Sequence, residues 1–297
     1  MGAKMKWYEV KERSAGEKRL LLTYYIFKIF GRIPVLVIAF FVALVTFCRE
    51  NDLRFYVKKY LSVVDEKPNY INVFRLFLSY AISSVDKIEV FAQKFDKKKI
   101  NTDSVCDLFW KLRGEKQGAV CVFSHVGNID VSRVLIGKEQ KISILLSLEQ
   151  AKTFRDFLGK ISDFKNINLV AVEDIGIETV IDLKNRIENG EFVFVAGDRT
   201  AKTSKNIEVE VLGRKVDFPY GSFKLAELLE SPVFFVSCLK MKKGYEMTVE
   251  QFLTGEKCAK KMADAFAVFV TAQVTKCPFQ FYHFYDFFKD EKNIKKP

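Results

Sequence analysis

The sequence is poor in the residues and motifs that build metal, redox and nucleotide sites. It has only two histidines, His125 and His283, which excludes a histidine-rich metal centre. Its six cysteines form no C-x-x-C pair and match no zinc spacing, and several lie in apolar runs, so we expect buried thiols in a reducing compartment. Neither G-x-x-x-x-G-K-S/T nor G-x-S-x-G occurs. Their absence argues against a P-loop nucleotide site and the usual serine-hydrolase elbow.

The composition is that of a folded protein with a basic surface. Apolar residues make up 49% of the 297 residues and charged residues 29%, which rules out a disordered or fibrous chain. Lys and Arg number 48 against 37 Asp and Glu, so the formal charge is +11. This charge favours an anionic partner: nucleic acid, anionic lipid or an acidic carrier protein. We expect no nucleic-acid partner, because the aromatic residues lie mainly in apolar runs and no helix-turn-helix or zinc signature occurs.

One long apolar segment covers residues 20–48. Residues 33–48 carry no charge and would form a helix of about 24 Å, shorter than the roughly 30 Å hydrocarbon core of a bilayer. A longer span would enclose Lys28 and Arg32. Basic residues flank the segment on both sides, so the positive-inside rule gives no orientation. We therefore predict that the segment dips into one leaflet and that its flanks bind an anionic membrane surface; the alternative is a buried core helix.

The rest of the chain changes character at Gly118. Residues 50–117 have helical periodicity, whereas later short apolar runs alternate with amphipathic stretches. Strands are expected at 119–124, 141–147, 167–172, 191–197, 207–213 and 232–238, and helices at 129–137, 149–160, 175–189, 221–229 and 257–275. This alternation predicts an α/β fold, with a mixed sheet flanked by helices and preceded by an N-terminal membrane-associated helical segment. The predicted division is 1–50 for that segment and 51–297 for one α/β domain.

A first candidate site follows the expected strand at 119–124. The motif SHVGNID places His125 at a strand-to-helix turn and Asp130 in the first turn of the next helix. A carboxylate at that spacing can bind one imidazole nitrogen and leave the other as a general base. Gly127 allows close approach of the backbone to a substrate, and Asn128 caps the helix or binds substrate. A histidine with a purely structural role in the loop is the alternative.

A second candidate site follows the expected strand at 191–197. The motif AGDRTAK places Asp198 and Arg199 at the carboxyl end of that strand, where open α/β sheets bind ligands. We expect the two side chains to be exposed and to clamp a substrate, since a guanidinium suits bidentate recognition of phosphate or carboxylate. The alternative is a surface ion-pair network.

Taken in order, these motifs resemble a known family. SHVGNID looks like the H-x4-D block of the lysophospholipid acyltransferase superfamily. The chain more closely resembles the bacterial branch of that superfamily, which contains the lipid A late acyltransferases and their relatives. Further similar blocks are WYEVKERSAGEKRLLL from Trp7, AGDRT from Ala196, VLGRKVDFPYGSFKLAELLESPVFFV from Val211 and CPFQFYHFYDFF from Cys277. The resemblance covers about residues 7–288.

The resemblance implies transfer of a fatty acyl group from an acyl thioester to a hydroxyl or amine of a lipid or glycolipid acceptor. It implies His125 as the general base and Asp130 as the residue that orients it. Arg199 would contact the acceptor phosphate or the donor. Phe218, Pro219 and Gly221 would shape the acyl pocket. No metal or cofactor is implied.

The resemblance also implies partners and a location. The donor would be an acyl carrier protein, whose acidity suits a charge of +11, or coenzyme A. The location would be the cytoplasmic face of the bacterial inner membrane.

Departures from the family pattern leave the acceptor open. Asp130 stands where the lipid A enzymes usually carry Glu, and Asp198-Arg199 stands where they usually carry Asp-Gln. Phe281-Tyr282 stands where Trp is common. Two other functions also stay open. One is a thioesterase in which water replaces the lipid acceptor at His125, and the other is a basic membrane-binding module without catalysis.

Overall fold

The structure is a computed structural model that describes residues 17–137, 139–161, 166–200, 205–253 and 258–289. The Trp7 end of the first family-like block and Lys202 of the AGDRTAK motif lie outside these residues.

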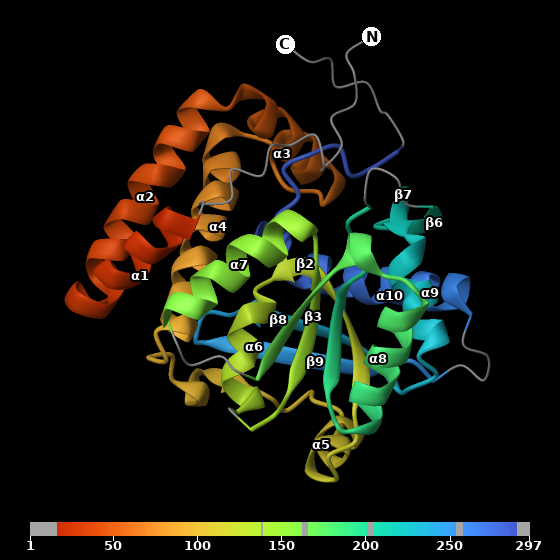
Figure 1. The fold of residues 1–297 in the computed structure, drawn as a ribbon. Coiled ribbons are helices and arrows are strands. Elements are labelled where there is room, and N and C mark those ends of the chain that lie inside the picture. The colour runs from red at the N-terminus through yellow and green to blue at the C-terminus, as the bar shows by residue number, and fades with distance from the viewer. Residues whose placement is uncertain (1–16, 138, 162–165, 201–204, 254–257, 290–297) are drawn as a thin grey trace.

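The N-terminal apolar segment forms two helices. Helix α1 (Glu17–Phe30) and helix α2 (Arg32–Arg49) meet at Gly31. Gly31 has a φ of +77°, a backbone conformation that glycine adopts without steric strain. They lie on the outer side of α4 (Tyr70–Phe91), away from the sheet (Figure 1). Helix α3 (Asn51–Val63) connects α2 to α4. The apolar stretch 20–48 is therefore divided by a turn, and α2 contains the uncharged residues 33–48.

The charge of Arg32 is paired inside the protein. Its guanidinium binds Asp86 and Glu89 on α4. Asp86 is 1% exposed and also binds Lys240 and Tyr245 of the sheet. This network joins the N-terminal helices to the sheet.

The main sheet has seven strands in the order β1-β9-β8-β2-β5-β3-β4. Their bounds are β1 Ile100–Asn101, β2 Ala119–Gly127, β3 Ile142–Leu146, β4 Ile167–Ala171, β5 Phe192–Ala196, β8 Val233–Lys240 and β9 Tyr245–Gln251. All neighbours are parallel except β8 and β9. The predicted mixed sheet is confirmed.

Helices cover both faces of the sheet because its central strands are apolar on both sides. On β2, Val120 and Val122 face one core, which includes residues of α10, whereas Cys121 and Phe123 face a second core under α5 and α6. The helices after α4 are α5 Asp107–Gly114, α6 Ile129–Ile136, α7 Leu148–Ile161, α8 Ile177–Glu188, α9 Tyr220–Leu228 and α10 Ala259–Lys276. In Figure 1, α6 and α7 lie in front of the sheet and α10 behind it.

A separate hairpin precedes α9. Strand β6 (Asn206–Val211) alternates exposed and buried residues and pairs with β7 (Arg214–Pro219). Leu212 and Gly213 connect them, both with positive φ, as a tight hairpin turn requires. Short 3-10 helices occur at Lys97–Lys99, Val172–Asp174 and Pro278–Gln280.

Candidate active site

The first histidine lies where two parallel strands end together. His125 is in the last part of β2, and Asp198 follows the end of β5. The two strands pair through Phe123 and Ala196, and the Gly197 N–H donates to the Phe123 carbonyl at 2.8 Å. The register of β2 against β8 shifts between Phe123 and Gly127, which is a bulge. A bulge changes the direction of the side chains on it. Here the bulged stretch contains His125, shortly before the turn into α6.

Asp198 holds His125 by two hydrogen bonds. The distance from His125 Nδ1 to Asp198 Oδ1 is 2.8 Å, and the backbone N–H of His125 donates to Oδ2 at 2.6 Å. A third group, His283 Nε2, lies 3.1 Å from the same Oδ2. The Asp198 side chain is fully buried, whereas that of His125 is 28% exposed. The imidazole is thus accessible while its carboxylate partner is not.

The electrostatics keep Asp198 ionised and set the tautomer of His125. Burial alone would raise the pKa of Asp198, but the charges and hydrogen bonds of His125 and His283 hold that pKa well below its usual value. An ionised carboxylate only accepts hydrogen bonds, so Nδ1 of His125 carries the proton that it donates. In the neutral ring the lone pair is then on Nε2, which is the form a general base needs.

The expectation that Asp130 fixes this tautomer is wrong, because the bond at Nδ1 belongs to Asp198. Asp130 is the second residue of α6 and is directed towards α4, where its Oδ2 lies 2.7 Å from Lys87 Nζ. Its Oδ1 lies 3.6 Å from Arg133 one turn on. Burial would raise the pKa of Asp130, but Lys87, Arg133 and the nearby charge of His125 lower it. Asp130 is therefore an ionised neighbour of His125.

The second predicted loop is partly corrected. Asp198 was expected to be an exposed half of a substrate clamp, yet it is 1% exposed and directed inward to His125. The physical reason is the β2–β5 pairing, which brings the loop after β5 against the end of β2. Arg199 is half-buried beside it, and its charge acts on His283 and Tyr285. A role for Arg199 in phosphate recognition stays a prediction.

Gly127 and Asn128 serve the backbone of the site. Gly127 has φ +73°, and a Cβ there would overlap the carbonyl oxygen of Cys238 on β8, so the close approach it permits is to a strand. Asn128 occupies the N-cap position of α6, but its side chain makes no capping bond. Its amide instead donates to the Ser83 carbonyl on α4 at 2.8 Å, and its N–H donates to Cys238 at 2.8 Å. Substrate contact by either residue stays a prediction.

The third family-like block lies at the junction of β7 and α9. Phe218 is fully buried and stacks on Phe223, which is the packing of a core residue. Pro219 precedes α9, and Gly221 is exposed in its first turn. Ser222 donates to the Ala196 carbonyl at 2.7 Å and so ties this junction to the end of β5. Whether the three predicted residues shape an acyl pocket stays a prediction.

Sequence reasoning missed the role of the closing aromatic block. Phe281 bridges to Val126, and the Tyr282 N–H donates to the carbonyl of His125 at 3.3 Å, which brings His283 to Asp198. The available signal was that this block contains the second of only two histidines.

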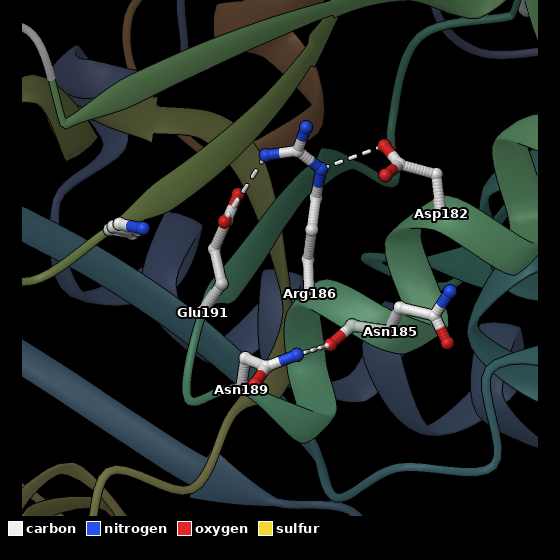
Figure 2. Close-up of a pocket in the computed structure, with 6 residues that line it drawn as sticks. Asp182, Asn185, Arg186, Asn189 and Glu191 are labelled. Carbon is white, nitrogen blue, oxygen red and sulfur yellow. Dashed lines mark hydrogen bonds and ion pairs between the residues drawn. The ribbon is translucent and has the colours of Figure 1, made fainter.

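A polar pocket of about 490 Å³ lies at the opposite, amino end of the strands. Arg186 on α8 is held there by Asp182 at 2.7 Å and by the buried Glu191 at 3.4 Å (Figure 2). Lys141 and Glu191 stand just before β3 and β5, whereas His125 is near the other end of β2. The positive charge of Arg186 is thus compensated by two protein carboxylates, and the pocket is separate from the histidine site.

Comparison with known protein families gives a match. A family described as bacterial lipid A biosynthesis acyltransferase matches residues 77–290, which is more than two thirds of the chain and includes His125, Asp130, Asp198 and His283. No curated protein matches.

Proposed function

The chain belongs to the bacterial lipid A biosynthesis acyltransferase family and is a lipid acyltransferase, and from this premise we propose that His125 is the general base of its transfer reaction. The observation that carries the proposal is the Asp198–His125 pair at the carboxyl end of two parallel strands, with the carboxylate buried and the imidazole accessible. Of the described residues, this pair best fits the requirement for an oriented base.

The proposed reaction needs one base and no covalent enzyme intermediate. His125 Nε2 takes the proton of the acceptor hydroxyl or amine as the oxygen or nitrogen attacks the thioester carbonyl. The C–S bond then breaks, the acyl group stays on the acceptor, and the leaving thiolate takes the proton back from the imidazolium. Asp198 stabilises that imidazolium while it exists, because the carboxylate is already ionised and in place. The scheme requires neither a metal nor a cofactor.

The two carboxylates near the base take different parts in this proposal. Asp198 fixes the ring by contact at Nδ1. Asp130 acts through its charge, since Lys87 and Arg133 hold its carboxylate beside the ring. Lys87 is partly exposed at this point, so we also propose that it contacts an anionic group of donor or acceptor.

We propose an acyl carrier protein as the donor and an anionic membrane as the surface on which transfer occurs, on the cytoplasmic face of the bacterial inner membrane. The net charge of +11 supports both, because each partner is acidic. Coenzyme A is the alternative donor, and the assay below distinguishes the two.

Helix α2 supports membrane attachment. It is the one described helix long and apolar enough to cross a bilayer, and only 11% of its 18 residues are buried inside the structure. A shallow apolar pocket on its surface is lined by Val37, Ile38, Phe41, Val42, Val45 and Thr46. Its length of about 27 Å and its packing along α4 favour a helix that lies in one leaflet beside the domain.

The proposal is tested by labelled transfer. Membranes containing the wild-type protein or His125→Ala are incubated with a thioester of acyl carrier protein or of coenzyme A that is radiolabelled in its acyl group, and the lipids are separated. We expect a new labelled lipid with wild type alone. Labelled free fatty acid without a labelled lipid would instead show a thioesterase, and equal labelling by both proteins would contradict the role of His125.

A further inference from the structure

The second histidine of the chain is completely enclosed next to the site. Its side chain is 1% exposed, and its Nε2 lies 3.1 Å from Asp198 Oδ2. The rings of Phe281, Phe287 and Tyr285 surround it, with ring centroids 4.0, 4.5 and 4.9 Å away. Asp198 is thereby placed between two imidazoles, one accessible and one enclosed.

The direction of the hydrogen bond follows from the protonation states. Asp198 is ionised and can only accept, so the proton lies on Nε2 of His283. Burial lowers the pKa of His283 to about 4, against the opposing effect of Asp198, so the ring is neutral near pH 7. Its Nδ1 has no hydrogen-bond partner among the described residues. The ring therefore has one polar contact there, which is the donation to Asp198.

The C-terminal segment holds this donor in place. The bridge between Val126 and Phe281 and the bond from the Tyr282 N–H to the His125 carbonyl fasten residues 281–283 to the bulged end of β2. Asp198 Oδ2 then accepts from two donors, the His125 N–H and the His283 ring. Its Oδ1 is left for His125 Nδ1. The geometry of Asp198 is thus determined from both sides.

We propose that His283 is a positioning residue of the acyl transfer reaction, whose Nε2–H fixes the Asp198 carboxylate and moderates its charge so that Asp198 can orient His125. This inference rests on the proposed function of His125. If His283 serves only to fill the aromatic core, the hydrogen bond is incidental and a ring of similar size would replace it.

The charged and titratable groups around His283 and His125 come from five parts of the chain. Those acting on His283 are Asp198 and Arg199 after β5, and His125 of β2; Tyr285 lies on its own segment. His125 is influenced from α6 by Asp130, behind which stand Lys87 of α4 and Arg133. With His283 neutral, its removal changes no net charge. Any shift in the titration of His125 then reports the hydrogen bond to Asp198.

Three substitutions separate the donor from the ring. His283→Gln places an amide N–H near the former Nε2, His283→Asn places one near the former Nδ1, and His283→Phe keeps a ring with no donor. We expect His283→Gln to retain kcat within a few-fold. We expect His283→Asn and His283→Phe to lose about 10- to 100-fold in kcat, with KM nearly unchanged. Equal activity of the Gln and Asn variants, or a fully active Phe variant, would contradict the proposal.

A second readout needs no substrate. Diethyl pyrocarbonate modifies neutral imidazole, and in untagged protein the accessible His125 and the enclosed His283 are the two histidine targets. The rate of modification of the His125 peptide is measured by mass spectrometry from pH 5 to 9. Loss of the donor concentrates charge on Asp198 and stabilises the His125 imidazolium, so we expect the midpoint to rise in the Phe and Asn variants and to stay in place in Gln.

The two readouts distinguish failure of this inference from failure of the proposed function. An unchanged midpoint in all three folded variants, checked by urea unfolding, would overturn the role of His283 even if transfer is observed. A midpoint that rises as expected in a protein without acyl transfer would support the link from His283 to His125 and contradict the proposed reaction alone.

Discussion

At the scale of single residues, the site depends on a contact that spans 73 positions in the sequence. Asp198 reaches His125 because β2 and β5 are neighbours in register, a fact that local spacing does not contain. The motif SHVGNID offered a nearer carboxylate, Asp130, and the sequence interpretation gave it the orienting role. His125 itself could be identified, because it follows an apolar strand at the edge where α/β sheets bind ligands. The pairing of β2 with β5, which brings Asp198 to His125, could not be identified from the sequence.

Asp198→Asn tests that contact. The amide would present an N–H or a neutral oxygen to Nδ1 and would favour the wrong tautomer of His125, so we expect kcat to fall about 10³- to 10⁴-fold with the fold retained. The measurement is steady-state acyl transfer together with urea unfolding. A folded variant with near-normal kcat would contradict the role of Asp198.

Asp130→Asn tests a charge effect. Removing the negative charge beside His125 makes the imidazolium less stable and lowers the pKa of His125. We therefore expect the acidic limb of kcat/KM to move to lower pH. Arg133→Gln removes a neighbouring positive charge and should move the same limb to higher pH; shifts in one direction for both variants would contradict this account.

The lowered pKa of His283 predicts how the free energy of unfolding depends on pH. Its pKa in the folded protein, about 4, is below the ordinary value of 6.5, so the unfolded state binds the proton first. The contribution of the neutral His283 to the free energy of unfolding is complete above pH 6.5. It is lost as the pH falls towards 4, which lowers the free energy of unfolding by up to about 3 kcal/mol. Urea unfolding should show a smaller loss over this range in His283→Gln than in wild type. Parallel curves for the two proteins would contradict the burial of a neutral His283.

At the scale of elements, hydrophobic patterning predicted most of the sheet. The runs after Gly118 became strands close to their expected bounds, because a strand buried on both faces is continuously apolar. Strand β9 (Tyr245–Gln251) and strand β7 (Arg214–Pro219) were missed, since their charged residues interrupt the apolar pattern. The turn at Gly31 was not predicted, and neither were the partners of Arg32 on α4, which only the folded chain brings near.

At the turn between β2 and α6, adding one methyl group at Gly127 is predicted to lower the stability of the protein strongly. Gly127→Ala places a Cβ against the Cys238 carbonyl at a positive φ, so we expect a loss of at least 1–3 kcal/mol in unfolding free energy and of acyl transfer, because His125 is displaced. Gly221→Ala is the control, since a Cβ there meets nothing within 4 Å and lies in helix α9. Urea unfolding of both variants is the measurement. Equal stabilities would show that β2 and β8 can separate at no cost.

At the scale of the whole molecule, an apolar pair of helices lies on one side of a basic α/β body. Figure 1 shows α1 and α2 outside α4. Many of the apolar side chains of these two helices are exposed. Phe41 and Val45 on α2 are 57% and 50% exposed, which is costly in water and favourable in an acyl-chain region. Attachment to an anionic membrane would cover this side of the molecule.

Phe41→Glu and Val45→Glu together test that attachment. We expect the double variant to lose most of its binding to vesicles that contain anionic lipid, measured by co-flotation. Val268→Glu is the control, because this residue of α10 is 70% exposed and stands outside the N-terminal helices. Unchanged flotation of the double variant, or equal loss in the control, would contradict a membrane contact through α2.

The most direct test of the central claim is the rate of label transfer from an acyl thioester to membrane lipid by purified wild type and His125→Ala, reconstituted at equal amounts in the same vesicles. We predict labelled lipid from wild type and at least a 10²- to 10⁴-fold lower rate from the variant, since the base is gone while the fold is kept. A comparable rate from folded His125→Ala would contradict the assignment of His125 as the base.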